Sequence, residues 1–359
     1  MEVFKIHQQV RLHKGYLRGI AYDLPRQSHW FLPVAVIDAV QALDGSPIER
    51  LLERLAHPDI PTGPWADRLL NEEVIFLLPQ AFIANFPALD LGYAKPGVIS
   101  TAVLPLPQMN SAIVEVLEMA GCQHLAVEVD PQEVSHLSEL WSVLDATSVN
   151  SVSLHLPHTE ELERLLKRQI HAKVKQVYVH DGPSFASRME RGFALHYSKK
   201  LGKEKYFRPS LVLNQDIYLE AIARNTYFNR KIFLTRDGHV TVGDEKARAL
   251  GRGKQVARDL QAHLDSLETP AIWLMRKDKV SVCANCELRY MCVDPRVPKQ
   301  RSDGSYFHES ECSYNPFIAK WSDEPGFVAL AKCGVVSNAE GLRIDHELIA
   351  AINAALWGA

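Results

Sequence analysis

Four of the six cysteines of this 359-residue chain lie close together in its last third, at Cys283, Cys286, Cys292 and Cys312. Two residues separate the first pair, five more precede the third cysteine, and nineteen precede the fourth. The thiolates of a C-x2-C pair face one point, and two later thiolates can complete a tetrahedron. The spacing therefore predicts a four-cysteine site for Zn2+ or a [4Fe-4S] cluster. The alternative is that these are core cysteines at chance spacing.

The composition indicates an ordinary folded chain in a reducing compartment. Hydrophobic residues make up 47% of the chain and charged residues 23%, and the length predicts two or three domains. The net charge of −3 gives no electrostatic indication of nucleic acid or an anionic membrane as a partner. No apolar run reaches the ~20 residues that span a bilayer, and the first residues lack the apolar core of a signal peptide. We therefore expect a cytoplasmic protein whose cysteines are reduced, with Cys122 and Cys333 as buried apolar side chains.

The first 92 residues combine strand-like and helix-like patterns. β-Branched and aromatic residues predict strands, and apolar residues at helical spacing predict helices. The strands are expected at 3–12, 16–24, 29–32 and 74–78, and the helices at 34–43, from Ser46 onward and at 64–71. Ser46 followed by Pro47 is typical of a helix start, with the serine as N-cap.

The first three of these strands, followed by the three helices, resemble the precursor-peptide recognition domain of enzymes that modify ribosomally made peptides. That domain is a small winged helix. The resemblance implies that a leader peptide adds to the sheet edge as an extra strand, next to a helix. Backbone hydrogen bonds then supply affinity, and side-chain pockets supply specificity. The alternative is a plain winged-helix or dimerisation module.

Residues 93–225 alternate between apolar strands and amphipathic helices. The strands are expected at 98–106, 124–129, 149–156, 174–179 and 211–213, and the helices at 111–120, 131–144, 159–170 and 217–223. Repeated β–α units predict an α/β fold with a parallel sheet covered by helices, in the form of a partial barrel.

Catalytic groups in such folds lie at the carboxyl ends of the strands. Five side chains there could converge on one acid–base or second metal site: Glu128, Asp130, His158, His180 and Asp181. The alternative is that they are ordinary caps and loop residues. No phosphate loop, nucleophile elbow or dinucleotide fingerprint follows any of these strands.

Residues 226–359 lead into the cysteines through a predicted hairpin with its turn at Asp237-Gly238 and a predicted helix at 254–267. This order, followed by C-x2-C-x5-C, resembles the SPASM domain of peptide-modifying radical SAM enzymes. The resemblance implies that Cys283, Cys286, Cys292 and Cys312 are the ligands of one auxiliary cluster site. The family's further cysteine falls on Arg296, and its upstream cysteines fall on apolar or small residues near Ile232 and Val242. The resemblance therefore implies that this chain has lost the other auxiliary cluster.

The chain lacks the C-x3-C-x2-C motif that holds the catalytic cluster of radical SAM enzymes, because the loop from Pro105 to Asn110 contains no cysteine. Radical SAM chemistry is therefore not expected. The segment 226–340 most resembles the SPASM-domain peptide maturase of grasp-with-spasm systems, which are encoded with an ATP-grasp ligase and a short precursor peptide. The resemblance implies a winged-helix-like domain at 1–92, a degenerate radical-SAM-like domain at 93–225 and a SPASM-like domain at 226–359.

The four cysteines are compatible with either Zn2+ or a [4Fe-4S] cluster. The family favours iron–sulfur, but an isolated cluster has no redox partner, and a closed structural site favours zinc. Asp294, Arg296, Arg301 and His308 lie between the third and fourth cysteines and are expected to surround the site or contact a peptide or partner.

Three functions follow as expectations. The first is a non-catalytic accessory protein that binds the leader of a precursor peptide and presents the peptide to an ATP-grasp ligase. The second is an enzyme with non-radical chemistry at the strand ends of the barrel. The third, a winged-helix regulator on DNA, is the weakest, because acids balance the basic residues of the first 92 positions.

Overall fold

A computed structural model describes residues 2–166, 170–182, 186–190, 192–197, 206–243, 247–251 and 255–358. The chain forms two compact units, each assembled from separate segments. The cysteine unit consists of Met1–Tyr93, Lys205–Thr226 and Met275–Ala359. The sheet unit consists of Ala94–Glu204 and Tyr227–Leu274.

These units divide the chain differently from the three expected domains, 1–92, 93–225 and 226–359. The predicted hairpin after residue 226 forms, but it joins the large sheet by pairing Lys231–Leu234 with Thr101–Pro105. The cysteine segment instead packs with the N-terminal residues. The hairpin therefore belongs to the sheet unit, because its first strand hydrogen-bonds to a parallel strand of the large sheet.

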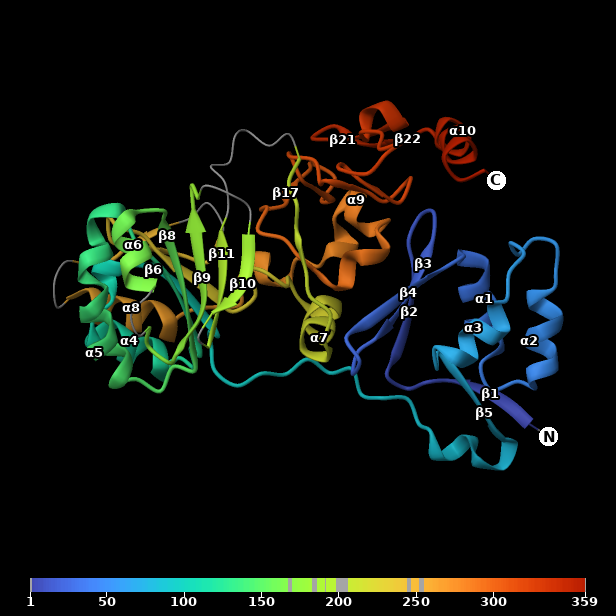
Figure 1. The fold of residues 1–359 in the computed structure, drawn as a ribbon, viewed down its shortest axis with the longest axis horizontal. Coiled ribbons are helices and arrows are strands. Elements are labelled where there is room, and N and C mark those ends of the chain that lie inside the picture. The colour runs from blue at the N-terminus through green and yellow to red at the C-terminus, as the bar shows by residue number, and fades with distance from the viewer. Residues whose placement is uncertain are drawn as a thin grey trace. The chain divides into compact units, whose positions relative to one another are not determined.

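The N-terminal part of the cysteine unit holds two small sheets (Figure 1). One pairs β1 (Glu2–Ile6) with β5 (Ile75–Pro79), and the other is an antiparallel meander of β2 (Val10–Lys14), β3 (Gly19–Asp23) and β4 (Ser28–Leu32). The single strand expected at 3–12 is therefore two strands in different sheets. A turn closed by the Val10 N–H on the His7 carbonyl, at 2.9 Å, separates them.

Three helices, α1 (Val34–Leu43), α2 (Ile48–Leu55) and α3 (Trp65–Asn71), complete this part and match the predicted helices. Their apolar faces bury Ile37, Leu51 and Leu69 in one core. The N-cap of α2 is Pro47 rather than Ser46, because the Ser46 backbone is engaged with strand β1.

The C-terminal part of the cysteine unit is built from short elements. They are α7 (Gln215–Ala223), α9 (Ser281–Ala284), α10 (His346–Trp357), and the strand pairs β12 (Ser210–Leu211) with β16 (Cys292–Val293), β17 (Lys299–Gln300) with β18 (Tyr306–Phe307), β19 (Tyr314–Asn315) with β20 (Lys320–Trp321), and β21 (Val335–Asn338) with β22 (Gly341–Ile344). The strand expected at 211–213 is thus not part of the parallel sheet, and it pairs with the strand that carries Cys292.

The sheet unit contains a nine-stranded sheet in the order β10-β11-β9-β8-β7-β6-β13-β14-β15. The strands are β6 (Thr101–Pro105), β7 (His124–Glu128), β8 (Ser151–Pro157), β9 (Val174–His180), β10 (Ala186–Glu190), β11 (Phe193–Tyr197), β13 (Lys231–Leu234), β14 (His239–Thr241) and β15 (Arg248–Ala249). The six strands from β11 to β13 in this order run parallel, and the remaining three are antiparallel additions at the edges. The predicted α/β class with a parallel sheet is confirmed.

One face of this sheet carries the helices α4 (Ser111–Met119), α5 (Leu137–Asp145), α6 (Glu160–Leu166) and α8 (Gln255–Asp265) (Figure 1). The helices and the inward strand residues form one large apolar core. The hydroxyl of Thr159 caps α6 by accepting the Leu162 N–H at 3.1 Å. Residues 167–169 of the helix expected at 159–170 lie outside the described residues.

None of the helices among the described residues is both long enough and apolar enough to cross a membrane. This agrees with the sequence, in which charged residues interrupt every apolar segment before ~20 residues are reached.

Candidate functional site

The four clustered cysteines are carried by short elements of the cysteine unit and line one cavity of about 30 Å3. Cys283 lies on α9, Cys292 begins β16, and Cys286 and Cys312 lie beside a 3₁₀ turn and a loop. The four side chains thus lie at one cavity, and their role as ligands of a shared site stays a prediction. The structure shows none of them in a disulfide.

Burial raises the pKa of each of these thiols. The pKa of Cys312 rises to about 11, and that of Cys286 rises well above its usual range, first by burial and then by the charge of Glu287. Four thiolates at this place therefore need positive charge, which a metal ion or cluster supplies when it binds.

Besides Arg289, two further cations line the cavity, Lys277 and Arg296. Both contact the buried carboxylate of Asp294, and Arg296 Nη2 lies 2.7 Å from Asp294 Oδ2. Burial alone would raise the pKa of Asp294, but the hydrogen bond from Arg296 and the charge of Lys277 lower it overall. This arrangement keeps positive charge beside the thiols.

Arg301 and His308 were expected near the site as well. His308 Nε2 is 3.5 Å from Asp294 Oδ2, so His308 belongs to the same charged group. Arg301 instead binds the β18 and β21–β22 region, for example through Nε to the Asn338 carbonyl at 2.6 Å. Arg301 therefore stabilises the C-terminal part of the cysteine unit and does not line the cavity.

The described part of the chain contains no group of three or more His, Cys, Asp or Glu side chains already arranged to hold a metal ion. The four thiols thus line one cavity, but they are not arranged as the ligands of a metal ion. The donor set and the shared cavity fit a metal centre, and the adjacent cations would offset the negative charge that four thiolates bring to it. Metal binding stays a prediction.

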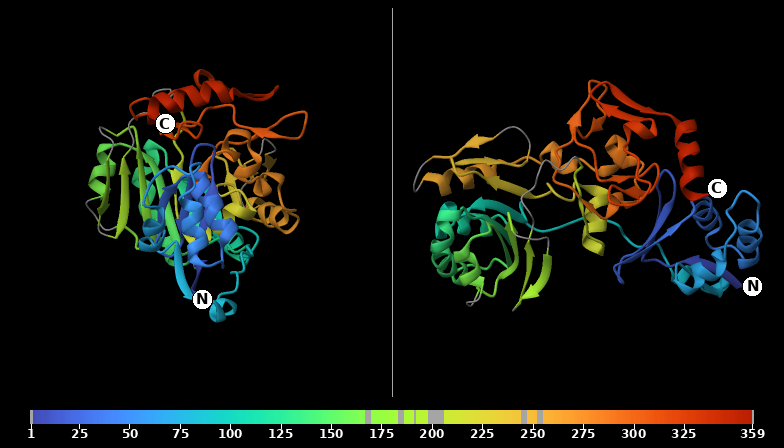
Figure 2. Two further views of the ribbon diagram at one scale, coloured as in Figure 1. Left: turned by 90° about the vertical axis from the view of Figure 1, so that its right-hand side faces the viewer. Right: turned by 45° about the horizontal axis from the view of Figure 1, so that its top comes forward.

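The loop between the second and third cysteines also contacts the N-terminal part. Arg18 Nε donates to Glu287 Oε1 at 2.8 Å, the Tyr22 hydroxyl donates to the Glu287 carbonyl, and Arg289 Nη1 donates to the Lys14 carbonyl at 2.8 Å. Figure 2 shows the β2–β3 hairpin beside this orange segment. The cysteine loop and the hairpin therefore form one structural piece.

Apolar packing joins the same two parts. A single buried cluster contains Ile20 and Tyr22 from the hairpin together with Leu288, Met291 and Tyr314 from the cysteine module. Residues 1–92 accordingly share a core with the C-terminal segment. An isolated fragment of these residues would expose that apolar surface to water.

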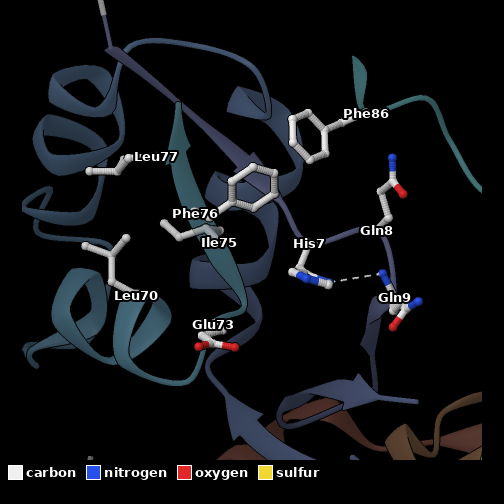
Figure 3. A pocket seen from close by; sticks show the side chains of 9 residues that line it. All are labelled: His7, Gln8, Gln9, Leu70, Glu73, Ile75, Phe76, Leu77 and Phe86. Carbon is white, nitrogen blue, oxygen red and sulfur yellow. Dashed lines mark hydrogen bonds between the residues drawn. The ribbon is translucent and has the colours of Figure 1, made fainter. Parts of the chain in front are cut away.

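A second candidate site is a groove of about 560 Å3 beside strand β5 (Figure 3). It is lined by His7, Gln8, Gln9, Leu70, Glu73, Ile75, Phe76, Leu77 and Phe86. Consecutive strand side chains point to opposite faces, so a groove lined by all three of residues 75–77 follows the edge of the strand. In Figure 3, Phe76 and Leu77 lie on opposite sides of β5, and the rings of Phe76 and Phe86 are 4.9 Å apart.

The backbone of β5 has hydrogen-bonding groups directed toward this edge. Phe4 of β1 turns its N–H to the Ser46 carbonyl (3.1 Å) and its carbonyl to the Gly45 N–H (3.0 Å), so it faces away from β5. Leu77 is directly opposite Phe4, and in an antiparallel ladder it must therefore also face outward. Ile75 has the same orientation two residues earlier. In the described part of the chain β5 pairs with β1 alone.

The five strand-end residues of the sheet unit lie at or just after the ends of β7, β8 and β9, and their convergence on one site stays a prediction. Asp130 pairs with Arg236, whose Nη2 lies 3.2 Å from Asp130 Oδ1. The His158 N–H donates to the His180 carbonyl at 2.8 Å, so these two strand ends are neighbours through their backbones. Glu128 is in register with His155 on β8, and Asp181 adopts a φ of 59° just after β9.

Sequence reasoning missed a group of side chains on the sheet face opposite the helices. His124 on β7 contacts Ser151 and Ser153 on β8, and His155 on β8 stacks on Tyr178 of β9 with ring centroids 4.6 Å apart. The available signal was the period of two in these strands, where polar residues alternate with buried Val and Leu.

Comparison with known proteins gives distant likenesses only. No family model matches the chain, and no curated protein matches it. A crystal structure of Streptococcus suis SuiB bound to S-adenosylmethionine matches with a TM-score of 0.27 and 11% identity, over 80% of this chain and 94% of that chain. A second crystal structure of SuiB matches with a TM-score of 0.23 and 9% identity over the same shares. TM-scores of this size support no conclusion about the fold or activity of this chain.

Proposed function

We propose that this protein is an accessory protein in the maturation of a ribosomally synthesised peptide. It binds the leader of the precursor and presents the peptide to an ATP-grasp ligase, without radical SAM chemistry of its own. The observation that carries the proposal is the groove along the edge of β5 that faces away from β1, where an apolar surface and outward backbone groups occur together.

An extended peptide suits this groove on physical grounds. A peptide strand beside β5 would exchange backbone hydrogen bonds with Ile75 and Leu77, as in other cases of β-augmentation. The apolar side chains of Phe76 and Phe86 would receive a large apolar side chain of the peptide. The proposed edge is that of β5, and not that of the three-stranded meander.

The cysteine site would hold either Zn2+, which we favour, or a [4Fe-4S] cluster. Cys283, Cys286, Cys292 and Cys312 would be its ligands, with Lys277 offsetting negative charge. When bound, such a centre supplies crosslinking of the irregular loops and, for a cluster, a possible electron acceptor. In this proposal its role is structural, because the cysteine loop supports the β2–β3 hairpin through Arg18 and Glu287.

Peptide binding is tested with the full chain, because residues 1–92 share their core with the C-terminal module. The cognate leader peptide is titrated against wild type, Leu77→Pro and Leu77→Ala, and affinity is measured by calorimetry. Proline removes the outward N–H and leaves the ladder to β1 intact, whereas alanine keeps that N–H and is the matched control. We expect about a tenfold greater loss for proline than for alanine. Equal affinities for the two variants, with both shown to be folded, would contradict binding at this edge.

The presentation step has a separate readout. The rate at which the ligase modifies its precursor is compared with and without this protein, using Leu77→Pro as the impaired control. A rate that is independent of the protein would contradict the accessory role, even if the leader binds.

A second function is a non-radical peptide-modifying enzyme with its site in the sheet unit. The specific observation in its favour is the pair of histidines on the sheet face, His124 and His155, whose pKa values are lowered to about 4 by burial and neighbouring positive charge. Groups of perturbed pKa at one place are typical of catalytic sites.

A further inference from the structure

The parallel sheet has two chemically different faces. The helix-covered face is built from Val, Leu and Ile residues of β6 to β9, β11 and β13. On the other face, four residues lie in register on four neighbouring strands: Glu128, His155, Tyr178 and His196. Parallel sheets normally bury apolar residues on both faces. A row of ionisable and aromatic side chains on such a sheet therefore requires a functional explanation.

A continuous chain of hydrogen bonds crosses this face. Ser151 Oγ lies 2.8 Å from His124 Nδ1, and His124 Nε2 lies 3.2 Å from Ser153 Oγ. Ser153 Oγ in turn lies 3.4 Å from His155 Nε2. Ser153 is 2% exposed, whereas the other three members are partly exposed. The buried hydroxyl thus connects two imidazoles that both reach the surface of this face.

Both imidazoles are neutral near pH 7. Burial is the largest cause of the lowered pKa of His155, followed by the charges of His180, His124 and Lys231. His124 is affected by burial and then by Lys231. The other titratable groups on the strands around His155 are Glu128 on β7, Tyr178 and His180 on β9, His196 on β11 and Lys231 on β13.

We propose that Ser151, His124, Ser153 and His155 form a proton-transfer chain, with His155 as a general base toward a protic group bound on this face of the sheet. The inference is independent of peptide binding in the cysteine unit. It adds a second site, and it gives the enzymatic alternative a definite base and a definite route for the proton.

The proton transfer is balanced along the chain. In one direction of the hydrogen bonds, His155 Nε2–H donates to Ser153, the Ser153 hydroxyl donates to His124 Nε2, and His124 Nδ1–H donates to Ser151. The bound X–H gives its proton to His155 Nδ1, and each member passes one proton onward. Ser151 releases one hydroxyl proton to water. The products are X⁻ and one hydrated proton, and no imidazolium ion is formed.

The acidity of peptide groups limits what X–H can be. A neutral imidazole of low basicity accepts a proton most readily from a relatively acidic donor. Among the neutral side chains of peptides, the thiol is the most acidic, with a pKa of about 8.5. A thiol is therefore the protic group that we expect to react with His155.

The chain is tested by NMR of the full protein labelled with 15N at histidine. His124 and His155 are each expected in a single neutral tautomer at pH 7, with assignment from His124→Gln and His155→Gln. Ser153→Ala should convert both histidines to mixed tautomers. The matched control is Ser187→Ala, because Ser187 Oγ is 3.0 Å from His196 Nδ1 in the same row but outside the chain, and it should affect His196 alone. Tautomers of His124 and His155 that do not change in Ser153→Ala would overturn the proposal.

The substrate group is tested with two small probes that differ in one atom, N-acetylcysteinamide and N-acetylserinamide. The expected result is a shift of the His155 resonances with the thiol that the alcohol does not reproduce. Equal shifts, or no shift with either probe, would overturn the thiol assignment. Failure of leader binding to β5 would change neither NMR result, so the two proposals fail separately.

Discussion

At the scale of single residues, Glu287 shows how the cysteine loop is held. Its side chain is fully buried, and Oε1 accepts hydrogen bonds from Arg18 and from the Tyr314 hydroxyl. A buried carboxylate that loses its cationic partner is strongly destabilising, typically by about 3–5 kcal/mol.

Arg18→Met is therefore expected to lower the free energy of unfolding of the cysteine unit by about 3 kcal/mol. Chemical denaturation followed by tryptophan fluorescence measures the change. The control is Lys14→Met, since the Lys14–Asp38 pair is about half exposed on both sides and should contribute less than about 1 kcal/mol. Similar losses in the two variants would contradict the structural role assigned to Glu287.

His13 predicts a pH dependence of stability. Burial, followed by the charges of Arg289 and Arg11, lowers its pKa to about 3, below the ordinary value of 6.5. The unfolded chain therefore binds the extra proton first as the pH falls, so stability is lost below about pH 6.5 and continues to fall toward pH 3. Between pH 7 and pH 5 the loss from this group is about 2 kcal/mol.

Unfolding free energies of wild type and His13→Gln at pH 7 and pH 5 test this effect. Glutamine keeps a partner for the Tyr218 hydroxyl, which is 2.7 Å from His13 Nε2, and removes the titration. We expect a smaller pH effect in the variant. His136→Gln, at an exposed position, should retain the full wild-type effect, and an unchanged pH effect in His13→Gln would contradict the prediction.

At the scale of elements, the turn of the β2–β3 hairpin approaches the cysteine loop closely. A Cβ on Gly15 would lie 2.8 Å from the Glu287 nitrogen and 2.8 Å from the Arg18 carbonyl oxygen. Both are backbone atoms, so the two elements would have to separate to admit one methyl group.

Gly15→Ala is accordingly expected to destabilise the protein by about 1–3 kcal/mol, seen as a lower melting temperature of the cysteine unit. Gly92→Ala is the control, because the atom nearest to its added Cβ is in the Asp90 carboxylate, a side-chain group, at 3.2 Å. A Gly15→Ala protein as stable as Gly92→Ala would show that the hairpin and loop can separate without cost.

Most of the elements could be predicted from sequence periodicity, but their partners could not. The parallel strands from β6 to β9 and the hairpin around Gly238 follow from local patterns, because each pattern is contained in one segment. The pairing of β12 with β16 and the break at His7 depend on contacts with distant residues. The same limit applies to the β5 edge, because the orientation of Leu77 is set by segment 44–46 across β1.

The candidate sites also differ in whether they could be predicted from the sequence. The four cysteines could be found from their spacing alone, and the structure places them at one cavity. The chain from Ser151 to His155 could not be recognised, because its hydrogen bonds cross from β7 to β8 and need the register of the two strands. The sequence shows a polar residue at every second position. It does not show which residues of the neighbouring strand these side chains contact.

At the scale of the whole molecule, the two units should respond differently to loss of the metal. If the cysteine site is a metal centre, chelation removes the charge that keeps four buried thiolates in place, and the loop that supports Arg18 and Tyr22 is released. The sheet unit contains none of these four ligands.

Hydrogen–deuterium exchange before and after chelation tests this difference. Protection should fall in residues 10–23 and 285–292 and stay unchanged in β7, β8 and β9. Restoring one equivalent of Zn2+ to the anaerobic protein should restore protection, and its metal content as purified distinguishes zinc from iron. Unchanged exchange everywhere would contradict the metal centre, and equal loss in both units would contradict the division described above.

The cysteine unit takes its segments from both ends of the chain, and this order has a consequence for synthesis on the ribosome. Residues 1–93 leave the ribosome before the sheet unit, but Leu288, Met291 and Tyr314, which cover Ile20 and Tyr22, are made after it. The nascent chain therefore carries an uncovered apolar hairpin throughout synthesis of the sheet unit. Translation arrested before residue 275 should yield a product that chaperones hold and proteases remove, although its first 93 residues are complete.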